Sequence, residues 1–425
     1  MDTELQRRKK AVQLYYYHHL SKAAICRQLA CTRSWLDRWL NRYDPDQVES
    51  SLQDRTRGPH HASSRWPEAM YQQVIDMRRT RSLRDQWPYA LKGAEAIHYE
   101  LQALGLSPVP PIRTIHSWLV KAGLVSSRQA RPTSRTRTPF PGPQPTSVNG
   151  IQQLDLKGPI YLRGSSQKHY LMVLRDRYSH RCAIHPLQSR ESSAIVTCLV
   201  TSWQWLGVPV YLQMDNALEF RGSHRYPRSF GQVVRVAVDI GTEPLFNPPH
   251  EPWRNGGVER QNGFLEDRLL AIEFDDFEAL TREVQVCQDA CNATHRLAAF
   301  DGLTPNQLAS QASLRLLSSA YTRHQRPLPQ HGGFVMFIRL VRKSGRITLG
   351  AGDRFMVDPD LAYTYVVARV DLARKCVAIS QYLNEKLLKI YDYSAETVGQ
   401  WAADEDESLD IKEQNCLVNS CTSEH

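Results

Sequence analysis

The stretch PPHEPWRNGGVERQNGFLEDRLL, residues 248–270, joins a loop to a helix. Its first half is rich in Pro, Asn and Gly, which favour turns. In its second half Val258, Leu265 and Leu269 recur at helical spacing and predict one buried stripe. Glu259 lies about 100° around the helix from Val258, at the border of that stripe, so its carboxylate can face a neighbouring sheet. The stretch therefore predicts an acid in the first turn of a helix that packs on a sheet.

Two further acids lie upstream, in segments whose sequence is typical of strands. Asp155 is flanked by two leucines in the strand expected over 148–158, although strand interiors disfavour Asp. A buried ionised acid needs a partner, such as a cation. Asp215 is near the end of the apolar run 209–216, and strand ends are where ligands bind to sheets of this kind. Three carboxylates from three elements can converge, and such oxygen ligands select Mg²⁺ or Mn²⁺.

Local roles for these acids are the alternative. Asp215 can cap the following helix, Glu259 can favour the positive start of its own helix, and Asp155 can pair with Lys157 or Arg175.

The sequence around the acids predicts an α/β domain over 148–322. Three strand-like runs come first, and a helix and further strands follow, which favours a mixed sheet flanked by helices. The expected strands are 148–158, 169–179, 181–187, 209–216 and 242–248, and the expected helix after the third strand is 191–207.

Two all-α units precede this domain, over 1–60 and 61–125. Each contains two short helices of helix-turn-helix outline, and Thr32 is expected to cap the second helix of the first unit. In that motif Arg33, Ser34 and Arg38 would face the major groove of DNA, and Arg113 is the corresponding candidate in the second unit. Any two packed helices have the same outline, so a purely structural role stays open.

The remaining segments are a linker, a barrel and a tail. Residues 126–147 are rich in Pro, Ser and Arg and predict a basic linker. Residues 323–394 predict a small SH3-like β-barrel, whose basic residues are either phosphate contacts or ordinary edge-strand charges. Residues 395–425 predict a disordered acidic tail.

Charge is distributed unevenly over the 425 residues. Residues 1–147 contain 23 Lys and Arg but 12 Asp and Glu, so the front carries a net charge of +11. Such a basic segment indicates a nucleic-acid partner. There is no apolar run of membrane-spanning length, and the nine scattered cysteines predict no disulfide framework. We expect an intracellular protein with reduced thiols and no membrane partner.

Three motifs in order, QQLDLKG, MDNALEF and PPHEPWRNGGVERQNGFL, resemble the signatures of the integrase-type DDE transposases, which include bacterial insertion-sequence transposases and the retroviral integrase core. The resemblance covers residues 145–310 and implies an RNase H-like catalytic fold. It also implies a polynucleotidyl transferase and endonuclease that cleaves 3′ ends and joins them to target DNA. Asp155, Asp215 and Glu259 match the family's three acids, which would hold two Mg²⁺ or Mn²⁺ ions.

The resemblance extends to neighbouring residues. Asn216 matches the Asn that follows the second acid, and Asn255 and Arg260 match residues around the third. Lys157 and Arg260 are candidate phosphate contacts, and Trp253 is either a base-stacking or a buried side chain. The implied partners are double-stranded DNA, both transposon ends and target, and further copies of the chain. The resemblance also implies a cytoplasmic, nucleoid-associated protein of bacterial type.

One position departs from the family pattern. Ala217 stands where the family usually has Gly after Asp-Asn, which would cost about 1–2 kcal/mol if the backbone there had a positive φ. Two other functions stay open at this point: an RNase H-type nuclease that cuts without joining, and a catalytically inactive DNA-binding regulator derived from a transposase.

Overall fold

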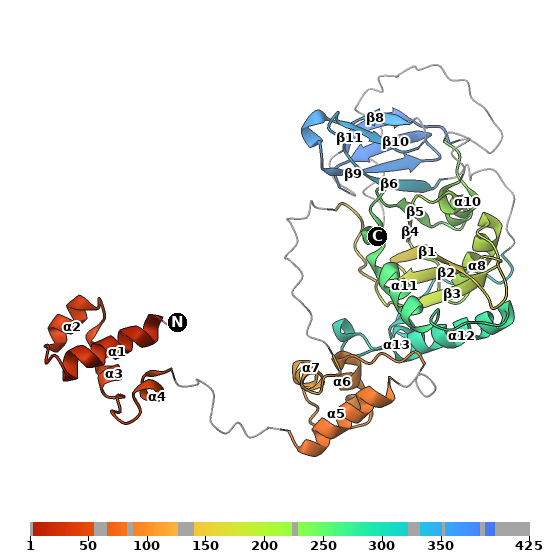
Figure 1. The fold of residues 1–425 in the computed structure, drawn as a ribbon. Helices are drawn as coiled ribbons and strands as arrows, with labels where there is room; N and C mark the ends of the chain where they lie inside the picture. The colour runs from red at the N-terminus through yellow and green to blue at the C-terminus, as the bar shows by residue number, and fades with distance from the viewer. Residues whose placement is uncertain are drawn as a thin grey trace. The chain divides into compact units, whose positions relative to one another are not determined.

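The computed structural model describes residues 3–54, 66–82, 88–125, 140–222, 228–321, 332–350, 353–382 and 387–395. The chain divides into two compact units, Met1–Pro67 and Glu68–His425. Each unit has its own core and is considered by itself (Figure 1).

The first unit is a small helical domain. Its helices are α1 (Thr3–Tyr16), α2 (Lys22–Gln28), α3 (Arg33–Leu40) and α4 (Val48–Leu52). They enclose a core that includes Ile25, Leu36, Trp39 and Leu52. Thr32 caps α3 as predicted, because its hydroxyl accepts a hydrogen bond from the backbone N–H of Trp35 at 3.3 Å.

The polar side of α3 is open to solvent. Arg33, Ser34 and Arg38 are all exposed, whereas Asp37 accepts a 2.7 Å hydrogen bond from Lys22 of α2. The helix pair expected from the sequence is therefore present, and its role in DNA binding stays a prediction.

The second unit begins with three helices, α5 (Glu68–Thr80), α6 (Ala94–Ala103) and α7 (Ile112–Lys121). Val74, Ile97, Leu101 and Ile115 are buried where these helices meet. Arg113 lies on the exposed side of α7, so it is accessible as the prediction requires.

A mixed sheet forms the centre of the second unit, as predicted. Its five core strands lie in the order β3-β2-β1-β4-β5, with β1–β3 antiparallel and β1, β4 and β5 parallel. The strands are β1 (Ile151–Ile160), β2 (His169–Asp176), β3 (Cys182–Leu187), β4 (Tyr211–Met214) and β5 (Glu243–Phe246).

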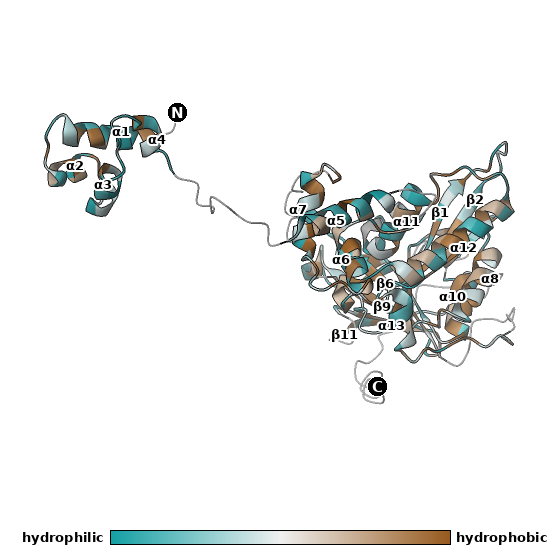
Figure 2. Ribbon diagram, turned by 90° about the horizontal axis from the view of Figure 1, so that it is seen from below, coloured by the Kyte–Doolittle hydropathy of each residue, from teal (hydrophilic) through white to brown (hydrophobic). Residues whose placement is uncertain are grey.

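Helices cover both faces of this sheet (Figure 1). Side chains of α8 (Ser192–Trp203) and α10 (Gln232–Asp239) pack with Leu154 and Leu212 on one face, and apolar residues colour much of these two helices brown in Figure 2. Side chains of α11 (Gly256–Arg268) and α12 (Phe277–Thr294) pack with Val173 on the other face. The short elements α9 (Leu218–Arg221), η1 (Pro252–Asn255), η2 (Ala298–Phe300) and α13 (Pro305–Ser310) connect these layers.

The C-terminal strands continue the central sheet. β6 (Phe334–Leu340) pairs in parallel with β5 through Leu245↔Met336 and Phe246↔Phe337. The sheet then continues through β9 (Tyr365–Asp371), β10 (Cys376–Ser380) and β11 (Leu387–Asp392), while β7 (Arg346–Thr348) and β8 (Arg354–Met356) form a separate hairpin and η3 (Pro359–Leu361) precedes β9. The separate SH3-like barrel expected over 323–394 is not confirmed, because the described strands form an open extension of the core sheet. The physical reason is that β5 offers an unpaired edge, which β6 covers.

Some predicted segments lie outside the described residues. They are most of the linker, 126–139, and nearly all of the tail, 396–425. The end of the linker is described, and Phe140 packs against Tyr365 of β9 with ring centroids 5.7 Å apart. None of the described helices combines the length and the apolar character needed to cross a membrane.

Candidate active site

The three predicted acids lie on three neighbouring elements of the second unit. Asp155 is within β1, Asp215 directly follows β4, and Glu259 is in the first turn of α11. Because β1 and β4 are adjacent parallel strands, the acid inside one and the acid after the other lie toward the same part of the sheet. Asp155 and Asp215 are half-buried, and Glu259 is exposed.

Helix α11 runs along β1 in a regular register that brings Glu259 to Asp155. The Asn262 carboxamide donates to Asp155 Oδ2 at 2.7 Å, and Lys157 donates to the Glu266 carboxylate. Two strand residues span about 6.7 Å and four helix residues about 6 Å, so alternate residues of β1 meet successive turns of α11. Glu259 is one turn before Asn262 and therefore on the same side of the helix.

A close backbone approach at Gly257 begins this register. A Cβ atom on Gly257 would lie 2.4 Å from Gln153 Oε1 and 3.3 Å from Arg175 Nη1. Gln153 Oε1 also accepts the backbone N–H of Val258 at 3.1 Å. A side chain at Gly257 would displace the Gln153 carboxamide and with it the hydrogen bond that holds the start of α11 to β1.

The electrostatics of Asp155 reflect the other two acids. Burial raises the pKa of Asp155 to about 6, and the nearby Asp215 and Glu259 carboxylates add to the increase. The hydrogen bond from Asn262 acts in the opposite direction, because it stabilises the ionised form. The three carboxylates therefore form one region of excess negative charge.

Asp215 also has a local structural contact. Its Oδ1 accepts the backbone N–H of Ala217 at 2.9 Å, next to the short helix α9. Burial raises the pKa of Asp215, and Glu219 acts in the same direction while Arg190 opposes it. Ala217 has φ −59°, so an alanine at this position causes no backbone strain.

A row of buried amides beneath the acids was not anticipated from the sequence. Gln153 on β1 donates to Gln213 on β4 at 3.1 Å, and Gln213 donates to Asn247 after β5 at 2.7 Å. Asn247 in turn donates to Asn255 Oδ1 at 2.7 Å. This chain of hydrogen bonds ties three strands to the loop that precedes α11. The signal available in the sequence was polar residues inside apolar strands, at Gln153 and Gln213.

Asn216 belongs to the same polar layer. Its Nδ2 donates to the Asn247 carbonyl at 2.7 Å, and its Oδ1 accepts from Arg339 of β6 at 2.7 Å. Arg339 is buried, which lowers its pKa to about 9. Asn216 therefore anchors the loop after Asp215 to the C-terminal extension, and its supporting role in catalysis stays a prediction.

The predicted DNA contacts near the acids differ in accessibility. Arg260 is exposed on α11, whereas Lys157 is paired with Glu266. Asn255 is 5% exposed and bonded to Asn247, so it orders the loop and does not present a free contact to DNA. The Trp253 side chain lies outside the described residues.

The donor set of the site suits a hard divalent cation. The three carboxylates together carry excess negative charge, and two of them have a raised pKa. They match the oxygen ligands that Mg²⁺ and Mn²⁺ prefer. In the described parts of the chain, no three His, Cys, Asp or Glu side chains are already arranged around a common metal position. Binding of one cation by all three acids therefore requires a rearrangement of their side chains.

No protein-family model matches the chain. No curated protein matches it either. Among the solved structures similar to the chain are retroviral integrase catalytic cores. The HTLV-2 integrase catalytic core domain in complex with magnesium, in its dimeric form, is 17% identical, with 39% of this chain and 99% of that one covered and a TM-score of 0.29. Its trimeric form is 18% identical over 39% and 99%, and the BIV integrase core is 19% identical over 38% and 96%, each with a TM-score of 0.29.

Proposed function

We propose that the chain is a DNA transposase of the integrase-type DDE class, with an RNase H-like catalytic core. It binds the ends of its element, cleaves them to free a 3′-OH, and joins that 3′-OH to target DNA. The observation that carries the proposal is the excess negative charge at Asp155, to which Asp215 and Glu259 both contribute. Asp215 and Glu259, which are 60 and 104 residues from Asp155 along the chain, both raise its pKa, as a shared site requires.

Each side chain of the site has a distinct task. Asp155, Asp215 and Glu259 would hold two Mg²⁺ or Mn²⁺ ions, which when bound activate the attacking oxygen and stabilise the leaving one. Asn262 orients Asp155 through its 2.7 Å hydrogen bond. The amide row below keeps β1, β4 and the loop before α11 at a constant separation. No covalent intermediate with the protein is required, because both attacking groups are oxygens of water or DNA.

The helical units at the front would bind the DNA ends. Arg33, Ser34 and Arg38 on α3 and Arg113 on α7 are exposed polar or basic side chains on helices of suitable length. Joining two ends requires at least two active sites, so we expect the chain to work as a homo-oligomer on DNA.

The direct test uses the full-length chain and labelled duplexes that carry the DNA flanking its gene. With Mg²⁺ or Mn²⁺ we expect 3′-end cleavage and insertion of the cleaved end into a plasmid, and EDTA should stop both reactions. Glu259→Gln should stop both while leaving duplex binding unchanged, and exposed Glu278→Gln on α12 is the matched control.

Two results would favour other functions. Cleavage without any joining of pre-cut ends would indicate an RNase H-type nuclease. Tight binding to the flanking DNA without metal-dependent cleavage or joining would indicate a DNA-binding regulator.

A further inference from the structure

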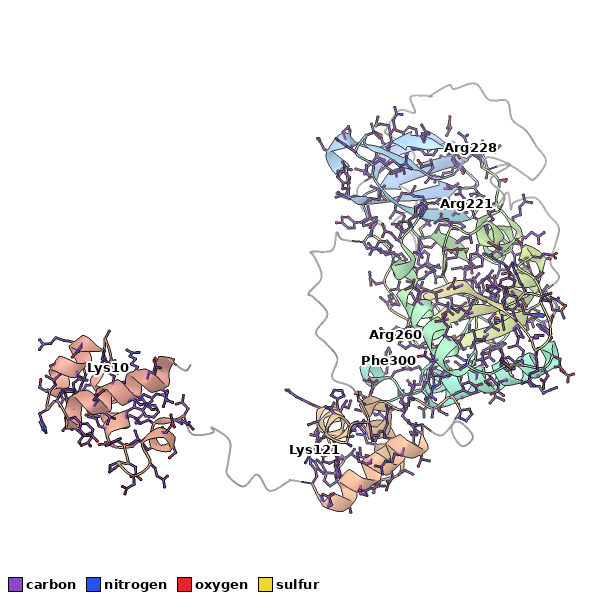
Figure 3. The ribbon with its side chains drawn as sticks, in the orientation of Figure 1. Lys10, Lys121, Arg221, Arg228, Arg260 and Phe300 are labelled. Atoms are coloured by element: carbon purple, nitrogen blue, oxygen red, sulfur yellow. The ribbon has the colours of Figure 1, made fainter. Side chains whose placement is uncertain are left out.

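A second site lies on the other side of α11 from the acids. It is a cavity of about 340 Å³ bounded by α11, the end of α12, η2 and the start of α6. Arg260 of α11 and Phe300 of η2, both labelled in Figure 3, line it. Its lining contains one acid and an excess of basic side chains, namely Glu95 against Arg175, His180, Arg260, His295 and Arg296.

Arg175 is the most deeply buried basic residue in the lining of this cavity. It lies on β2, is 8% exposed, and donates from Nη1 to the Gly257 carbonyl. Its Nε has no hydrogen-bond partner among the described residues. Burial lowers the pKa of Arg175, and the nearby Arg260 acts in the same direction. A buried guanidinium without a counter-ion is unfavourable by several kcal/mol, so this position favours an anion.

The protein compensates the charge of Arg175 only in part, because burial lowers its pKa more than the nearby Cys182, Cys291 and Asp176 raise it. Within the described parts of the chain, no carboxylate forms an ion pair with Arg175, Arg260 or Arg296. Glu95 instead accepts the backbone N–H of Ala298 at 3.0 Å. Burial lowers the pKa of His180 to about 4, with Arg175 and Arg260 adding to the decrease, so this imidazole is neutral at pH 7.

We propose that this cavity binds a phosphate group through Arg175 and Arg260, with Arg296 at its rim. Planar guanidinium groups match the oxygens of phosphate with paired hydrogen bonds, and a neutral His180 can donate a further one. The volume is at the lower end of the range for small-molecule pockets, which suits one phosphate with an attached sugar. The phosphate comes either from a free phosphate compound or from a DNA backbone. Occupation by DNA rests on the proposed function, whereas binding of free phosphate does not.

The first experiment measures thermal unfolding of the full-length chain with inorganic phosphate or a 5′-mononucleotide. Chloride replaces phosphate at constant ionic strength, and no divalent metal is present. We expect saturable stabilisation by phosphate, because a ligand that binds only the folded chain raises its stability. Arg260→Gln should weaken the apparent affinity at least about tenfold, and Arg282→Gln, on an exposed side of α12 and paired with Glu278, should not. Equal behaviour in chloride and phosphate, or in wild type and Arg260→Gln, would overturn the inference.

The second experiment locates the phosphate and identifies its source. An arginine-specific dicarbonyl reagent is applied with and without phosphate, mononucleotide or a short duplex, and modification of Arg260 and Arg175 is read by mass spectrometry. Protection by phosphate and by the duplex supports a DNA phosphate, and protection by phosphate or mononucleotide alone supports a free compound. If stabilisation occurs without protection at either arginine, the phosphate binds elsewhere and the cavity assignment is wrong. If phosphate protects the arginines but the chain shows no metal-dependent cleavage, the phosphate site is supported and the proposed function is wrong.

Discussion

Helix α11 separates two regions of opposite charge. Glu259 and Arg260 are adjacent in sequence, yet one lies with Asp155 and Asp215, and the other lines a cavity with Arg175. Successive residues of a helix point about 100° apart, so the two charged side chains lie on different sides of α11. The two other acids raise the pKa of Asp155, and the neighbouring Arg260 lowers the pKa of Arg175. The excess charge on one side of α11 does not neutralise the charge on the other side. The acidic side therefore favours a bound cation, and the basic side favours a bound anion.

The largest effect is expected at the acidic side. Asp215→Asn removes one charge of the proposed metal site, and we expect cleavage and joining to fall about a thousandfold or more, equivalent to about 4 kcal/mol of barrier. DNA binding should be unchanged, because the substituted side chain keeps its shape. The measurement is a gel assay of cleavage beside a mobility shift, with exposed Asp289→Asn as control. Retained activity in Asp215→Asn would remove this acid from the mechanism.

The next effect concerns stability. The folded chain raises the pKa of Asp155 from 3.8 to about 6, so it holds this proton more tightly than the unfolded chain does. The contribution of Asp155 to stability therefore falls as pH rises from about 4 to about 6, by about 3 kcal/mol in total. Asp155→Asn should abolish activity and raise the free energy of unfolding at pH 7.5 by up to that amount, with little change at pH 4.

Urea unfolding at the two pH values measures this difference. Mg²⁺ should stabilise wild type at pH 7.5 and have much less effect on Asp155→Asn. A variant less stable than wild type at pH 7.5 would show that Asp155 is satisfied by its present neighbours without a cation.

A smaller effect is expected at the basic side. Arg260→Gln should weaken duplex binding at low salt by about tenfold and reduce the slope of log K against log salt by about one, as the loss of one phosphate contact predicts. The slope is obtained from binding isotherms over a range of salt concentrations, with Arg282→Gln as the matched surface control. An unchanged slope would separate the cavity from DNA binding.

The smallest effect tests the contact between β1 and α11 on the acidic side. Lys157 and Glu266 form an ion pair between β1 and α11, with side chains 26% and 56% exposed. A double-mutant cycle of Lys157→Met and Glu266→Gln should give a coupling of less than about 1 kcal/mol, as is usual for partly exposed pairs. If Glu266→Gln also strengthens DNA binding, the ion pair competes with a phosphate for Lys157, as the sequence prediction for Lys157 requires.

Local pattern was sufficient for the elements that carry the acids. Alternation and strand-end chemistry predicted β1 with Asp155 inside it and β4 with Asp215 after it, and helical spacing predicted α11 with Glu259 in its first turn. It did not predict Gln153, Gln213 and Asn247, whose hydrogen bonds join segments 34 to 60 residues apart.

The C-terminal strands illustrate the same limit. The sequence pattern predicts these short strands and the turns between them, but it favours a separate barrel. The pairing of Leu245 with Met336 instead joins them to the core sheet. Nothing local distinguishes a strand that closes a barrel from one that extends a sheet, because both alternate with period two.

The sequence alone determined which residues lie on strands, on helices and at their ends, because these properties follow from periods of two and 3.6 residues and from turn chemistry within a few positions. The tertiary structure decided which of these residues meet. It sets α11 along β1 so that Asn262 contacts Asp155, and it buries Arg175 beside Arg260 without a carboxylate partner among the described residues. Both outcomes depend on how a helix and a strand more than 80 residues apart pack together, and that packing minimises free energy over the whole core.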